Sequence, residues 1–175
     1  MENLDPRKRD IAIDIKQICG CLCCDTEDMS RFIALVDDLD LNSHLTQDEN
    51  GHKSISNLTF GDAGYFVDKY SSIMTTRYED LSLSKSTIVK HYPGSTMQPQ
   101  LDLDGSELTV VFVFGNADFP NDVSVNFPNL TPSTHTLEIG DAISFPSGVS
   151  EFAYLINNTS TDPIYTLTLY FNPVA

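Results

Sequence analysis

The chain has 175 residues and a net charge of −15, from 25 acidic and 10 basic residues. This length suffices for one domain with a substantial core, and a hydrophobic fraction of 41% excludes a globally disordered chain. The acidic excess argues against nucleic acid and anionic membranes as partners, since both require clustered Lys and Arg. No apolar run approaches the ~20 residues that span a bilayer, and the N-terminus lacks an apolar signal segment, so we expect a cytoplasmic protein.

All cysteines of the chain lie in one short stretch, at Cys19, Cys21, Cys23 and Cys24. A zinc site normally needs two separated ligand pairs, and the chain has no second cysteine pair or close histidine pair. We interpret the cluster as reduced, partly buried thiols, with a metal or redox role as the alternative.

The first predicted helix covers residues 26–39. Asp25 is a suitable N-cap, and the acidic Glu27 and Asp28 fall in the first turn. Apolar residues then recur at helical spacing: Met29, Phe32, Ile33, Val36 and Leu39. Residues 11–24, before this helix, fit either a strand or a short helix.

A second helix is predicted after Asp62, which can act as its cap. Its buried stripe comprises Phe66, Tyr70, Ile73, Met74 and Tyr78. The polar residues 40–60 between the two helices indicate a loop with room for one short strand. Both helices are expected to cover a core rather than to bind a cofactor.

From Ser86 onward the pattern changes to short extended runs. Strands are predicted at 86–92, 97–102, 107–114, 123–127, 134–138, 142–146, 151–156 and 164–172. Turn signals such as Pro93-Gly94 and Gly140-Asp141 separate them. Short strands at regular spacing predict a sandwich or barrel. We therefore expect one α+β, mainly β domain over residues 1–175, with a helical layer at 1–80 and a β core at 81–175.

The stretch from Tyr92 to Asp102 has the form of a metal-site strand, with an aromatic residue, a glycine turn and polar side chains two residues apart. Gln100 and Asp102 point to the same face of an extended strand. Tyr92-Pro-Gly94 and Gln100-Leu-Asp102 resemble the Tyr-x-x-Gly and His-x-Asp signature of the 2-oxoglutarate (2OG) and Fe(II)-dependent dioxygenases of the prolyl-hydroxylase type. This resemblance implies a double-stranded β-helix (jelly-roll, cupin-like) core with an N-terminal helical layer.

Later segments extend the resemblance to roughly residues 60–172. Gly140-Asp-Ala-Ile-Ser-Phe-Pro-Ser147 resembles the family's Gly-x-Ala-x-x-Phe-Pro-Ser strand and the second cupin motif. Glu151 then stands where both motifs place a His. The final strand, from Ile164 to Phe171, resembles Arg-Tyr-x-Leu-x-x-Trp-Phe, so that Ile164 occupies the family's Arg position.

The resemblance implies a metal site in which two of the three ligands are changed. Gln100, Asp102 and Glu151 would form an oxygen-only set, which suits Mg²⁺, Mn²⁺ or Ca²⁺ better than iron. A buried 2OG carboxylate needs a cationic partner, whereas Lys90 is the last basic residue of the chain. The expected pocket residues are Tyr92, Phe112, Phe145 and Tyr165.

The histidines offer no clear replacement for the missing ligands. His91 and His135 are candidates, but regular alternation would turn His91 away from Gln100 and Asp102. We interpret both as hydrogen-bonded imidazoles, and His44 and His52 as loop residues without a special role.

These observations favour a catalytically degenerate, dioxygenase-like jelly roll without a cofactor. Such a pseudoenzyme would act as a binding or structural module through a protein partner or self-assembly, for example as a bacteriophage accessory or virion protein, in the host cytoplasm or the virion. One alternative is an active 2OG-dependent hydroxylase that uses Fe(II), held by Asp102 and Glu151. Another is a binding domain stabilised by a divalent cation without catalysis.

Overall fold

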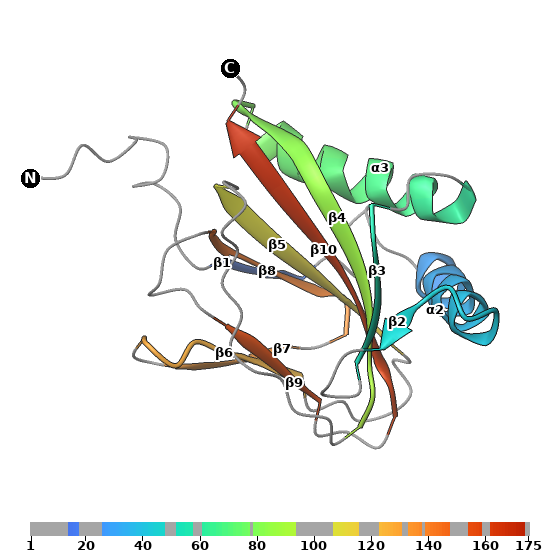
Figure 1. Cartoon of the computed structure of the whole chain (residues 1–175). Helices are drawn as coiled ribbons and strands as arrows, with labels where there is room; N and C mark the ends of the chain where they lie inside the picture. The colour runs from blue at the N-terminus through green and yellow to red at the C-terminus, as the bar shows by residue number, and fades with distance from the viewer. Residues whose placement is uncertain are drawn as a thin grey trace, which may run out of the picture.

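The described residues form two helices, a large sheet and a small sheet in three layers (Figure 1). The helices cover one face of the large sheet, and the small sheet lies on its opposite side. The computed structural model describes residues 14–17, 26–47, 52–57, 61–77, 79–93, 107–115, 123–130, 133–137, 139–147, 154–158 and 162–173.

The large sheet has the strand order β1-β8-β5-β10-β4-β3-β2, and all neighbouring strands are antiparallel. Its strands are β1 (Asp14–Gln17), β2 (Thr46–Gln47), β3 (Lys53–Ser56), β4 (Leu81–His91), β5 (Leu108–Phe114), β8 (Asp141–Pro146) and β10 (Ile164–Pro173). The small sheet has the order β7-β6-β9 and contains β6 (Val123–Asn126), β7 (Thr134–Leu137) and β9 (Leu155–Asn158). The chain passes repeatedly between the two antiparallel sheets, which confirms the predicted α+β, mainly β jelly roll.

The two predicted helices are present as α2 (Thr26–Leu41) and α3 (Gly61–Arg77). Of the two predicted N-caps, Asp25 lies outside the described residues. Asp62 lies within the first turn of α3 rather than at its N-cap. None of the helices that the structure describes is long and apolar enough to cross a membrane.

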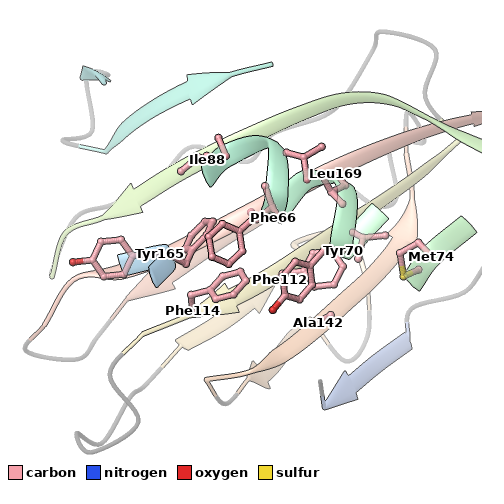
Figure 2. Packing of buried hydrophobic residues seen from close by; sticks show 14 of the residues in the cluster. Phe66, Tyr70, Met74, Ile88, Phe112, Phe114, Ala142, Tyr165 and Leu169 are labelled. Atoms are coloured by element: carbon pink, nitrogen blue, oxygen red, sulfur yellow. The ribbon is translucent and has the colours of Figure 1, made fainter. Parts of the chain in front are cut away.

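The core between the helices and the large sheet is rich in aromatic residues (Figure 2). Phe114 of β5 stacks on Phe32 of α2 with 4.1 Å between ring centroids. Phe112, two residues earlier on the same face of β5, meets Tyr70 of α3 edge-on at 5.1 Å. Both helices are therefore anchored to the same strand by rings that alternate along it.

A second apolar core fills the space between the two sheets. The large sheet contributes the alternate side chains Val111 and Val113, together with Phe145, and the small sheet contributes Val125 and Phe127. β5 is buried on both faces, which explains its uninterrupted run of apolar residues.

A β-bulge interrupts the pairing of β4 with β10. Tyr170 pairs with Lys85, but the next residue, Phe171, pairs with Leu83, so Ser84 is the additional residue on β4. Leu83 packs on the helix-side core, whereas Lys85 reaches over the ring of Tyr170 on the opposite face. The bulge therefore changes the face to which the odd-numbered side chains of β4 point.

Most predicted strands are present, but their boundaries differ from the predicted ones. β4 begins five residues earlier than predicted, because the bulge breaks the alternation that marks a strand. Residues 46–56, predicted as a loop with room for one strand, contribute both β2 and β3. The predicted strand at 97–102 lies outside the described residues, and residues 11–24 contain the strand β1.

Candidate functional site

A cavity of about 100 Å³ lies between the two sheets. The large sheet lines it with Thr87, Val89 and His91 of β4 and with Thr166, Thr168 and Tyr170 of β10. His52 and Ser54 complete this wall, and Tyr154 and Ile156 close the cavity from the side of the small sheet.

The polar wall follows from the register of β4 and β10. Thr87 pairs with Thr168 and Val89 pairs with Thr166, so both strands present every second residue to the same face. Hydroxyl groups thus occupy positions that would be apolar if this space were filled by core packing alone. The cavity is suited to a polar occupant.

Two histidines lie side by side at one end of the cavity. His91 is 1% exposed and His52 2%, with 5.0 Å between the centroids of their rings. Nε2 of His91 and the Thr166 hydroxyl oxygen form a hydrogen bond of 2.9 Å, while Nδ1 of His91 has no hydrogen-bond partner among the described residues. Burial, reinforced by the nearby His52, lowers the pKa of His91 to about 3, so its imidazole is neutral at pH 7.

This pair confirms one histidine interpretation and corrects another. His91 is a buried, hydrogen-bonded imidazole as predicted, but His52 is also buried and is not a plain loop residue. The pairing of Lys53 with Lys90 brings His52 next to His91, and a short edge strand gives little sequence signal for such a contact. His135 lies instead on the small sheet, edge-on to Phe127 at 5.6 Å.

Lys90, the last basic residue of the chain, points away from this cavity. Its Nζ lies 2.9 Å from Oδ1 of Asp37 and 3.0 Å from Oδ2 of Asp40, both on α2. Burial alone would lower the pKa of Lys90, but these two carboxylates outweigh it and raise the pKa. Ile164, at the position that the resemblance assigns to Arg, is fully buried in the apolar core between the sheets.

The predicted pocket aromatics do not gather around one cavity. Tyr92 and Tyr165 donate hydrogen bonds to carboxylates of α2, at 2.7 Å to Asp40 and 2.8 Å to Asp37. Phe112 packs under α3 (Figure 2), and only Phe145 faces the space between the sheets. The lining residues on β4 and β10 were missed, although their alternation with apolar neighbours was visible in the sequence.

The predicted metal ligands Gln100, Asp102 and Glu151 all lie outside the described residues, as do the four cysteines. Within the described ranges, no group of three or more His, Cys, Asp or Glu side chains is placed to hold a metal ion. The described part of the site is therefore the hydroxyl- and imidazole-lined cavity.

No protein-family model and no curated protein sequence matches the chain. Solved structures do match its fold. A prolyl-4-hydroxylase from Pseudomonas putida has a TM-score of 0.71 at 12% identity, with 95% of each chain covered. A viral collagen prolyl hydroxylase from Paramecium bursaria Chlorella virus-1, solved with 2OG, has a TM-score of 0.67 at 8% identity, with 94% of this chain and 98% of that chain covered.

A 2OG-Fe(II) oxygenase family protein from Burkholderia pseudomallei matches with a TM-score of 0.62 at 10% identity, over 95% of this chain and 88% of that chain. These structures confirm, at the level of the fold, the resemblance to the prolyl-hydroxylase type of 2OG-Fe(II) oxygenase. They also contradict the prediction of a protein without cofactors, because one matched structure is a 2OG-Fe(II) oxygenase family protein and another is a complex with 2OG.

Proposed function

We propose that this chain is a 2OG- and Fe(II)-dependent oxygenase of the hydroxylase type. The observation that supports this most directly is the polar cavity between the two sheets of a fold shared, over nearly the whole chain, with prolyl hydroxylases. A fold alone does not determine an activity, so the residues around the site must also suit the cofactors.

The donor set suits a divalent metal in part. Asp102 and Glu151 would hold it through two carboxylates, and the amide oxygen of Gln100 would be a weaker third donor. When bound, Fe(II) and 2OG supply the activation of oxygen that hydroxylation requires.

The described residues contribute binding and exclusion of water. The hydroxyls of Thr87 and Thr168 can hydrogen-bond a polar ligand within the cavity. Neutral His91 fixes the orientation of the Thr166 hydroxyl through their hydrogen bond. Behind them the buried Ile164 and Phe145 keep water out of the space between the sheets.

Succinate production tests this function. Purified protein with Fe(II), 2OG and ascorbate is expected to form succinate above a metal-free blank, and Asp102→Ala is expected to abolish it because a charged ligand is lost. Asp68→Ala removes an exposed carboxylate from α3 and should leave the rate unchanged. Succinate at the level of the blank, with folded protein, would exclude the proposed activity.

A binding module without turnover is the second candidate, and one observation favours it. The position of the family's Arg is the buried Ile164, and Lys90 is engaged by α2 on the far side of the sheet. In this case 2OG and Mn²⁺ should raise the melting temperature without any succinate being formed. A protein or a second copy of the chain would then be the partner.

A further inference from the structure

The basic side chains of the molecule are distributed unevenly between the two faces of the large sheet. Five Lys or Arg side chains belong to the residues whose side chains are described, and four of them are paired with carboxylates of α2 or α3. These pairs are Arg31 with Asp62, Lys53 and Lys90 with Asp40, and Lys69 with Asp28.

Lys85 is the exception. It has no carboxylate partner among the residues that the structure places, and its Nζ lies 5.1 Å from the centre of the Tyr170 ring. Tyr170 pairs with Lys85 across the β4–β10 register and lines the cavity between the sheets. An ammonium group that contacts an aromatic ring, and that has no carboxylate partner within the described ranges, therefore lies beside the wall of a polar cavity.

The cavity contains a second feature that indicates a polar occupant. Nδ1 of His91 is buried in its wall without a hydrogen-bond partner in the described part of the chain. Buried polar atoms in proteins are nearly always hydrogen-bonded, so a partner from outside the protein is expected there. Between His91 and Lys85, Thr87 and Thr168 present hydroxyl groups from paired positions.

We propose that this cavity binds a ligand with an aliphatic carboxylate, and that Lys85 pairs with the carboxylate at the Tyr170 end, next to the hydroxyls of Thr87 and Thr168. Lys85 would thereby supply, from β4, the cation that β10 lacks at Ile164. Two sources share this chemistry: 2OG itself, and an acidic group on the substrate. Only the first of them rests on the proposed function.

The acidic character of the protein does not oppose this assignment. Charges further away than about 8 Å are largely screened at physiological ionic strength. The carboxylates of Asp37 and Asp40, which pair with Lys53 and Lys90, lie on the helical face of the sheet. The carboxylate of a ligand would therefore meet an unneutralised lysine and two hydroxyl donors, which together favour its charged form.

Calorimetric titration of the full chain under anaerobic conditions, with Mn²⁺ present, tests the proposal without any turnover. The probes are 2OG and N-acetylglutamate amide, which carries a single side-chain carboxylate. At least one acid should bind, and Lys85→Gln should weaken that binding by about tenfold or more. Lys85→Arg, which keeps the charge, should stay within a few fold of the wild type.

Arg31→Gln is the matched control, because it removes one positive charge from the helical side of the sheet. It should leave the affinity for the acid unchanged. If Lys85 had no role, the wild type and Lys85→Gln would bind the acid with equal affinity. If only net charge mattered, Arg31→Gln would weaken binding as much as Lys85→Gln. Either result, or no binding of either acid to the wild type, overturns the proposal.

The two probes identify the source of the carboxylate. Lys85-dependent binding of 2OG alone assigns the site to the cosubstrate, and Lys85-dependent binding of the blocked glutamate alone assigns it to an acidic substrate. Lys85-dependent binding without any succinate production would reject the proposed function and retain the carboxylate site. Succinate production, together with an affinity for both acids that does not depend on Lys85, would support the proposed function and reject the carboxylate site.

Discussion

The two faces of the large sheet differ in how completely their polar groups are paired. On the helical face, Asp40 accepts hydrogen bonds from Lys53, Lys90 and Tyr92, and its pKa is held far below the usual range by those donors, with Lys53 as the largest contributor. On the inner face, Lys85 contacts the ring of Tyr170 and pairs with no carboxylate of the described residues, and hydroxyl groups line the cavity.

This difference distinguishes polar groups that stabilise the fold from polar groups that are available to a ligand. Paired charges on the helical face hold α2 and α3 on the sheet, because each carboxylate joins a helix to a strand or to the other helix. Groups left for a ligand are found where no helix covers the sheet. Substitutions of Phe114 and Asp28 test the packing and ion pairing of the first face, and substitution of His91 tests the burial of the second.

The largest effect is expected from removing an aromatic anchor on the helical face. Phe114→Ala should lower the free energy of unfolding by about 3–5 kcal/mol, because the ring is fully buried against Phe32 and Phe66. Urea denaturation measures this loss. Leu41→Ala, at a residue that is 83% exposed, should change almost nothing. A loss below about 1 kcal/mol for Phe114→Ala would contradict the packing described above.

The buried carboxylate of Asp28 should give the second largest effect. It accepts hydrogen bonds from Lys69, Tyr65 and Tyr70 of α3, and Asp28→Asn should cost about 2 kcal/mol because charge-assisted hydrogen bonds are lost. Denaturation curves at pH 7 measure it, with the exposed Asp68→Asn as a control of little effect. Equal midpoints for Asp28→Asn and the control would show that α2 and α3 are not joined through this group.

The pH dependence of the same group has a defined sign. Burial alone would raise the pKa of Asp28, but the three hydrogen bonds outweigh it and lower the pKa below 3.8. Its contribution to stability is therefore present above pH 3.8 and is lost as the pH falls through the lower folded value. The Asn variant should lack this acid-induced loss.

The smallest effect, taken over a single pH unit, is the pH response of the inner face. His91 is neutral in the folded protein down to about pH 3, whereas the unfolded chain takes up a proton below about pH 6.5. Stability should fall between these values by at most about 1.4 kcal/mol per pH unit. His91→Gln should flatten this slope, and His44→Gln, at an exposed residue, should not. The same slope in the wild type and in His91→Gln would exclude a buried neutral His91.

Sequence periodicity was sufficient for the helices and for most strands. Met29, Phe32 and Val36 are buried as their spacing predicted, and β5 coincides with an apolar run. The turn before β8 was also visible, because Gly140 adopts a φ of 94° that other residues rarely reach. β2 and β3 were not resolved from the loop because short, polar edge strands depend on pairing with a distant partner rather than on local pattern.

The site was less predictable, for physical reasons. The sequence resemblance places the position of a cation only on the strands after Lys90, whereas Lys85 is on β4, which neighbours β10 in the sheet but precedes it by more than half the β core in sequence. Lys90 lies five positions after Lys85, and this odd spacing places the two side chains on opposite faces of a regular strand. Which of them faces the cavity depends on the bulge and on long-range register.

The bulge at Ser84 has a consequence for how the chain tolerates insertions and deletions. Without Ser84, Leu83 and Lys85 would be neighbours in a regularly alternating β4, and each would keep the face that it occupies now. Deletion of this one residue should therefore be tolerated, whereas deletion of a residue between Lys85 and His91 would turn part of the strand to the opposite face.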